Sequence, residues 1–222
     1  MNVGPRVSLD DAWKKITLKY SELKKLSPGV LGCRFLYSPR STFTTNNGLL
    51  IAGMNPGREA DMDDRAYPRK DCNAYLWEEW TRSGGYQDRV RNFVERLARA
   101  LGQSDWQEFF NNTVTSNFLP FRSESYPALG SALRPAKAFA HELWLQLIPQ
   151  LGVRTLVCFG SDAKAGFAQV IAKLDVWSQP GLLPLQHSRC GRVTDAEIEM
   201  AKRLFEGGAP SGRPLTHGDA EG

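Results

Sequence analysis

Short apolar runs that alternate with amphipathic stretches are the feature of this sequence that most restricts its fold. The runs "LLIAG" at 49–53, "NTVTSNF" at 112–118 and "RTLVCFG" at 154–160 are apolar or β-branched and have the length of buried strands. A fourth run, "LLPLQ" at 182–186, fits a last short strand. Since strands that alternate with helices form parallel sheets covered on both faces, the pattern predicts an α/β domain with three αβα layers and a central, mostly parallel sheet. We expect the first three strands to be parallel and adjacent.

The stretches between these strands carry helix signals. Residues 8–26 place Trp13, Ile16 and Tyr20 on one face, and Ser8 is suited to cap the first turn. The other expected helices are 87–101 with its stop at Gly102, 134–151 with Pro135 in the first turn, 161–173 capped by Ser161, and a last helix opened by the capping box "TDAE" at 194–197. We therefore expect one domain over residues 1–206, followed by a disordered Gly- and Pro-rich tail at 207–222.

Composition excludes several classes of protein. The sequence is 41% hydrophobic and 23% charged, and no apolar run approaches the roughly 20 residues that span a bilayer. The first residues lack the apolar core of a secretion signal, so we expect a cytoplasmic protein without a membrane partner. Four scattered cysteines form no Cys-x-x-Cys pair, which argues against zinc and iron–sulfur sites. We expect reduced thiols, no metal, no cofactor and a monomer.

Glycines and polar residues gather where the expected strands end. The turn "GMNPG" at 53–57 follows the first strand, Asn117 closes the second, and "QHSRCGR" at 186–192 follows the last. Parallel sheets bind ligands at the carboxyl ends of their strands. A net charge of +4 permits a polyanionic partner without demanding one.

These segments carry a resemblance to a known family. "GMNPG" after an apolar strand resembles the first motif of the uracil-DNA glycosylase superfamily, in the form found in its single-strand-selective and mismatch-specific branches. "VTSNFLPFRS" at 114–123 is similar to the strand-Asn-loop segment of that superfamily, and "LIPQLGVRTLVCFGSDA" at 147–163 resembles the helix, strand and turn that follow. "QHSRCGR" stands where the second motif, His-Pro-Ser-Pro, would fall, but both prolines are absent. The resemblance covers residues 48–195 and implies a uracil-DNA glycosylase-like fold.

The resemblance also implies two catalytic residues. Cleavage of a base from deoxyribose passes through an oxocarbenium-like state while the departing base collects negative charge. Asn55 would orient the attacking water through its side-chain carbonyl, and His187 would donate to the base oxygen on which the charge develops. The plainer interpretations are that Asn-Pro-Gly is only a turn and that His187 is a surface loop histidine.

Binding roles follow by the same comparison. The backbone at Gly53 and Met54 would contact the base, Tyr67 would stack on it, and Asn117 would read its hydrogen-bonding edge. The alternatives are that Tyr67 packs with Pro68 and that Asn117 merely closes a strand. The residues expected to contact the DNA backbone are Pro56, Gly57, Arg122, Ser188 and Arg189.

The resemblance therefore implies a monofunctional DNA glycosylase that hydrolyses the N-glycosidic bond of uracil or a related deaminated base. Its partner would be single- or double-stranded DNA. Two other functions stay open at this point. One is a catalytically silent nucleic-acid-binding relative, suggested by the missing prolines, and the other is a small-molecule enzyme that binds a nucleoside or nucleotide at 53–57.

Overall fold

The computed structural model describes residues 6–57, 64–80, 85–185 and 193–207. At its centre lies a four-stranded sheet of the order β3-β2-β5-β6, in which every neighbouring pair is parallel. The strands are β2 (Leu49–Gly53), β3 (Val114–Asn117), β5 (Thr155–Phe159) and β6 (Gly181–Leu185). The expectation that the first three are parallel and adjacent is confirmed. β3 is shorter than the expected 112–118 because Asn112 caps the end of the preceding helix.

Five longer helices flank the sheet, close to the positions that the sequence predicts. They are α1 (Leu9–Leu26), α3 (Tyr86–Ala100), α5 (Leu133–Gln150), α6 (Ser161–Ile171) and α7 (Asp195–Gly207). The shorter elements are α2 (Ala74–Trp77), α4 (Trp106–Asn111), the 3-10 turns Arg40–Phe43, Tyr126–Ala132 and Val176–Ser178, and an antiparallel pair of β1 (Gly32–Cys33) with β4 (Phe121–Arg122). No helix in these described ranges has both the length and the apolar character needed to cross a membrane.

Two of the three capping residues expected from the sequence, Ser8 and Thr194, cap their helices, and Ser161 does not. Ser8 accepts from the backbone of Asp11, whose carboxylate accepts in return, and Thr194 forms the same box with Glu197. The expectation that Ser161 caps α6 is wrong: Gly160 is the cap, at φ 103°, and Ser161 is the first helical residue. A φ of this sign favours glycine, so the cap moves one position earlier. The expected tail at 207–222 begins inside α7 with Gly207, and 208–222 lie outside the described residues.

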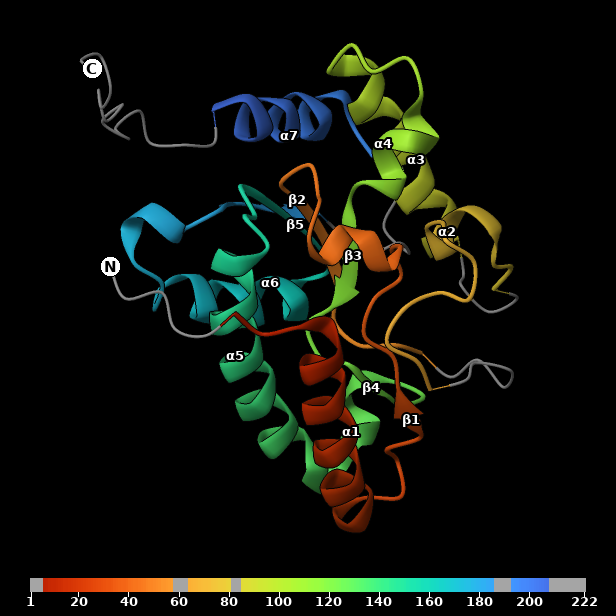
Figure 1. Ribbon diagram of the computed structural model, residues 1–222, viewed down its shortest axis with the longest axis vertical. Helices are drawn as coiled ribbons and strands as arrows, with labels where there is room; N and C mark the ends of the chain where they lie inside the picture. The colour runs from red at the N-terminus through yellow and green to blue at the C-terminus, as the bar shows by residue number, and fades with distance from the viewer. Residues whose placement is uncertain (1–5, 58–63, 81–84, 186–192, 208–222) are drawn as a thin grey trace, which may run out of the picture.

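The sheet separates two apolar cores, because alternate residues of each strand point to opposite faces. Leu50 and Leu156 pack in the core covered by α1, α5 and α6. Ile51 and Val157 pack in the core covered by α3, α4 and α7. Figure 1 shows α1 and α5 on one side of β2, β3 and β5, with α3, α4 and α7 on the other. Helices on both faces leave the carboxyl ends of the strands as the place where loops gather.

One close contact fixes α6 against the loop that follows β3. A Cβ on Gly166 would lie 2.7 Å from a ring carbon of Phe118, which has no exposed surface. The Phe118 ring is itself held by Phe167 at 5.1 Å and His141 at 5.3 Å between ring centroids. The ring is therefore buried and held by neighbouring rings, so it cannot easily move aside.

We therefore expect Gly166→Ala to destabilise the protein, although alanine favours helices. The steric cost of overpacking, about 1 to 3 kcal/mol, should exceed the gain of about 1 kcal/mol in helix propensity. Gly207→Ala at the end of α7 is the control, since a Cβ there meets no atom within 4 Å in the part of the chain that the structure describes. Urea unfolding monitored by circular dichroism gives both values. Equal stability of Gly166→Ala and the wild type would contradict the packing argument.

Candidate functional site

β2 and β3 stay paired beyond their ends, so that the turn 53–57 and the segment 117–123 lie side by side. Gly53 faces Asn117 in parallel register. Three backbone hydrogen bonds continue the pairing: Phe118 N donates to Gly53 O at 2.9 Å, Leu119 N to Met54 O at 2.8 Å, and Ser123 N to Pro56 O at 3.2 Å. The turn is thus held by the neighbouring segment along its length, at the carboxyl edge of the sheet.

Asn117 is buried at this edge, with 6% of its surface exposed. Its Oδ1 lies 2.6 Å from where a Cβ on Gly53 would stand, and the hydroxyl of Tyr86 lies 2.9 Å from the same point. Glycine at position 53 therefore lets both side chains approach the backbone closely. The Asn117 side chain also hydrogen-bonds Tyr37, whose pKa is raised by burial despite this bond and the nearby Arg34 charge. Tyr37 accordingly keeps its proton at neutral pH.

Asn55 is half-buried in the middle of the turn, and its amide is anchored to the protein. Nδ2 donates to the Ser123 hydroxyl at 2.8 Å and to Pro56 O at 3.1 Å. Among the described residues, Oδ1 of Asn55 accepts no hydrogen bond. The amide is therefore fixed through its nitrogen, and its oxygen is the atom left for a water or ligand.

The other residues of the turn differ in burial. Met54 packs partly against the core that contains α1 and α5, and Pro56 is buried. Gly57 is exposed, and a Cβ there would meet no atom of the described residues within 4 Å. Nothing in the described fold requires glycine at 57, and the DNA contact expected at Pro56 and Gly57 stays a prediction.

Tyr67 contacts the side chain of Arg40. Its hydroxyl accepts from Arg40 Nη1 at 3.4 Å, and the Arg40 guanidinium stands 5.5 Å from its ring centroid. Arg40 is also paired with Asp10 of α1 at 2.9 Å. These contacts give Tyr67 a packing role beside α1, and its stacking on a base stays a prediction.

Arg122 is largely buried, with 7% of its surface exposed, and its Nη1 lies 3.7 Å from Asp64 Oδ1. The same carboxylate oxygen accepts from Cys33 N at 2.7 Å, which ties it to β1. A phosphate at Arg122 would have to compete with Asp64. The expected DNA contact of Arg122 stays a prediction.

His187, Ser188 and Arg189 fall in 186–192, outside the described residues. The strand before them, β6, runs parallel to β5 and pairs with it as far as Leu185. β6 therefore ends at the same edge of the sheet as the turn 53–57.

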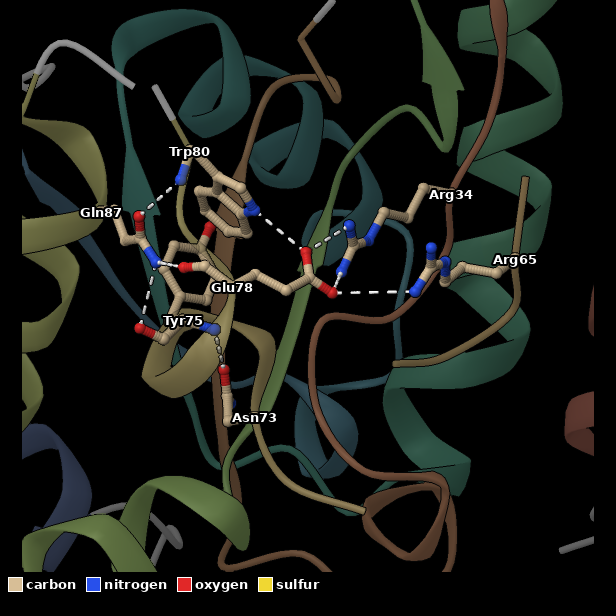
Figure 2. A network of polar contacts seen from close by, with 7 residues as sticks. All are labelled: Arg34, Arg65, Asn73, Tyr75, Glu78, Trp80 and Gln87. Atoms are coloured by element: carbon tan, nitrogen blue, oxygen red, sulfur yellow. Dashed lines mark hydrogen bonds and ion pairs between the residues drawn. The ribbon is translucent and has the colours of Figure 1, made fainter. Parts of the chain in front are cut away.

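A buried ion pair next to this edge was not expected from the sequence. Arg34, whose side chain has no exposed surface, donates to both carboxylate oxygens of Glu78 at 2.8 Å. Figure 2 shows the Glu78 carboxylate between Arg34 and Arg65 on one side and the Trp80 indole on the other. Trp80 Nε1 donates to it at 2.9 Å, and Arg65 Nη1 lies 3.9 Å away. Such bidentate, charge-assisted bonds fix both side chains firmly.

Opposing effects act on the Glu78 carboxyl group. Burial on its own would raise its pKa, but hydrogen bonds and charge from Arg34, the Trp80 N–H and the Arg65 charge outweigh burial, and the pKa is lowered. Glu78 is therefore ionised at neutral pH and neutralises Arg34.

The ion pair is linked to Asn117 through an aromatic cluster. The Arg34 guanidinium stands 4.2 Å from the Tyr37 ring centroid, and Tyr37 packs against Trp80 at 5.5 Å and Tyr75 at 5.6 Å. Tyr37 in turn hydrogen-bonds Asn117. The Arg34–Glu78 pair thus supports an aromatic wall near the end of β3, which consists of Tyr37, Tyr75 and Trp80.

The segment that carries Glu78 and Trp80 is fastened at both ends, as Figure 2 shows. Asn73 caps α2 by accepting from Tyr75 N at 3.1 Å and reaches Thr115 of β3 at 3.1 Å. On the other side, Gln87 of α3 accepts from Trp80 N at 3.3 Å and donates to the Glu78 carbonyl. The cluster is therefore part of the rigid frame of the sheet edge.

No group of three or more His, Cys, Asp or Glu side chains that could hold a metal ion occurs in the described ranges. Cys33, Cys72 and Cys158 are free thiols. The candidate polar side chains that the paired segments carry to the sheet edge are instead the uncharged amides of Asn55 and Asn117. Such groups can hold a water or a planar hydrogen-bonding ligand, but they are not strong bases.

The chain matches no protein-family model, and a search of the curated proteins finds no match to it.

The ion pair leads to a stability prediction. Glu78→Gln should lower the free energy of unfolding by about 3 to 5 kcal/mol, because it leaves the buried Arg34 charge without a counter-charge. Glu22→Gln is the matched control, since Glu22 pairs with Lys19 at 2.7 Å on the surface of α1 and the loss should be at most about 1 kcal/mol. Urea unfolding measures both. Equal losses in the two variants would show that the Arg34–Glu78 pair contributes no more than a surface pair.

The lowered pKa of Glu78 also predicts a pH dependence. In the unfolded chain a glutamate titrates near pH 4.3, so the contribution of the pair is fully present above about that pH and is lost as pH falls through the lower folded-state pKa. The stability gap between the wild type and Glu78→Gln should be constant from pH 7 to about 5 and should narrow below about 4. Urea unfolding across this range tests it. A gap that stays constant down to pH 3 would contradict the direction of the shift.

Proposed function

We propose that the protein is a DNA glycosylase of the uracil-DNA glycosylase type, with the three-layer αβα fold of that superfamily. It would hydrolyse the N-glycosidic bond of uracil or a related deaminated base in DNA. The observation that carries the proposal is the pairing of the turn 53–57 with the segment 117–123, because it brings Asn55 and Asn117 to one edge of a parallel sheet. These are the two side chains to which the resemblance assigns the water and the base.

The geometry of Asn55 suits the first task. Its nitrogen is occupied by Ser123 and Pro56, so its carbonyl oxygen can accept a hydrogen bond from water. An amide holds such a water in place but takes up its proton poorly, so slow chemistry is expected.

Asn117 suits the second task. An amide side chain offers both a donor and an acceptor, which matches the edge of a pyrimidine that has left the base stack. Its burial helps, since a wrong base edge would leave polar groups unpaired out of water. Gly53 lets the Asn117 side chain approach the strand end closely, and the resemblance assigns contact with the base to the backbone at Gly53 and Met54.

The rest of the proposal comes from the resemblance. His187 would meet the charge on the departing base, and the contacts to DNA would include Pro56, Gly57, Arg122, Ser188 and Arg189. No cofactor takes part in this reaction. DNA affinity would fall with rising salt concentration, because phosphate contacts release counterions.

The direct test is single-turnover release of a base from oligonucleotides that contain uracil, hypoxanthine or xanthine. Release of at least one of these bases, from single- or double-stranded substrate, supports the proposal. Wild-type protein that binds the oligonucleotides in a salt-sensitive way but releases no base would overturn it and favour a binding-only relative. Binding of free nucleotides without binding of DNA would favour a small-molecule enzyme.

Within this proposal, Asn55→Ala should slow base release by about 100- to 1000-fold, the usual loss when one preorganised polar group is removed. DNA affinity should change little, since phosphate contacts supply most of it. Gln179→Ala is the control, because it removes an exposed amide on another loop. Circular dichroism establishes that each variant folds. A release rate of Asn55→Ala within about twofold of the wild type would remove Asn55 from the catalytic machinery.

A further inference from the structure

Ser123 lies behind Asn55 and has no exposed surface. Its backbone N–H donates to Pro56 O, and its hydroxyl contacts both Asn55 Nδ2 at 2.8 Å and Ser125 O at 2.7 Å. Ser123 therefore touches the turn 53–57 through its backbone and its side chain. Such a residue can control the orientation of the Asn55 side chain.

The directions of these hydrogen bonds follow from chemistry alone. A backbone carbonyl only accepts, so the Ser123 hydroxyl donates its one proton to Ser125 O. Towards Asn55 the same oxygen can then only accept. The Asn55 atom that faces it must be the NH₂ group.

A second acceptor, the carbonyl oxygen of Pro56, also requires the NH₂ group of Asn55 on this side. Pro56 O lies 3.1 Å from the Asn55 nitrogen and also receives the Ser123 N–H. An amide rotated by 180° would place Oδ1 of Asn55 against two acceptors and would lose two hydrogen bonds. Rotation is therefore strongly disfavoured, and the orientation is fixed by partners that cannot change roles.

We propose that Ser123 is a positioning residue, which locks the amide of Asn55 so that Oδ1 is the atom offered to a bound water. This inference rests on the proposed function for its effect on rate, but not for the orientation itself.

The orientation matters because it decides how a water is held. A water that donates a proton to Oδ1 keeps a lone pair for the C1′ carbon of the sugar. A water held by an N–H would use a lone pair in that bond. In the reaction the C1′–O bond forms, the C1′–N bond breaks and its electron pair leaves with the base, and a proton from the water ends on the base. Ser123 would favour the water orientation that makes attack possible.

A double-mutant cycle tests the effect on rate. Ser123→Ala should slow single-turnover base release by about three- to tenfold, the usual worth of one hydrogen bond. In an Asn55→Ala background the same change should have no effect, because Ser123 acts only through Asn55. Ser123→Thr, which keeps the hydroxyl, should recover most of the rate. Ser27→Ala is the matched control, since Ser27 is a buried serine whose hydroxyl accepts from Gly29 N at 3.2 Å away from the site.

A second measurement does not depend on activity. The two side-chain NH₂ protons of Asn55 are both hydrogen-bonded within the protein, so NMR should show slow exchange with solvent in the wild type and faster exchange in Ser123→Ala. Rapid exchange in the wild type would overturn the proposal even if Ser123→Ala does not fold. Equal slowing of base release by Ser123→Ala with and without Asn55 would also overturn it. If the NH₂ protons of Asn55 exchange slowly but the protein releases no base, the proposed orientation of the amide stands and only the glycosylase function is rejected.

Discussion

The continued pairing of β2 with β3 beyond their last strand residues is the constraint on which the candidate site depends. Parallel strands are joined by crossover connections, usually a helix, which start at the carboxyl end of a strand. Here the backbone of 117–123 goes on donating to the turn 53–57 as far as Pro56. Asn55 and Asn117 come from segments more than sixty positions apart in sequence, and this pairing is what gives them a fixed relation to each other.

Uncharged and charged side chains occupy two neighbouring regions. Asn55 and Asn117, at the sheet edge, do not ionise, so in the proposed function they would act through the direction of their hydrogen bonds. A buried ion pair, Arg34–Glu78, lies nearby, and its guanidinium stands over the ring of Tyr37, which hydrogen-bonds Asn117. A buried pair is costly to desolvate, and we infer that its contacts with Tyr37 and Trp80 hold these aromatic side chains in one arrangement.

Local signals made most of the fold predictable from the sequence. The parallel strands and the boxes at Ser8 and Thr194 each depend on residues a few positions apart. The sequence did not predict that Gly160 rather than Ser161 caps α6, because the backbone angle decides between them. It also did not predict α4, because this helix is short, although Asp105 is a good cap. The ion pair could not be predicted, since Arg34 and Glu78 are 44 positions apart and only the folded chain joins them.

The same distinction explains why the sequence could suggest Asn55 as a candidate site residue but could not suggest Ser123. Asn55 belongs to a short motif with a recognisable order of residues. Ser123 matters only through the direction of its hydroxyl proton, which is set by the carbonyl of Ser125. The turn places the Asn55 side chain at the sheet edge, but an amide has two nearly isosteric ends. A serine on the neighbouring segment determines which end is presented, so the chemistry of the turn depends on the loop that pairs with it.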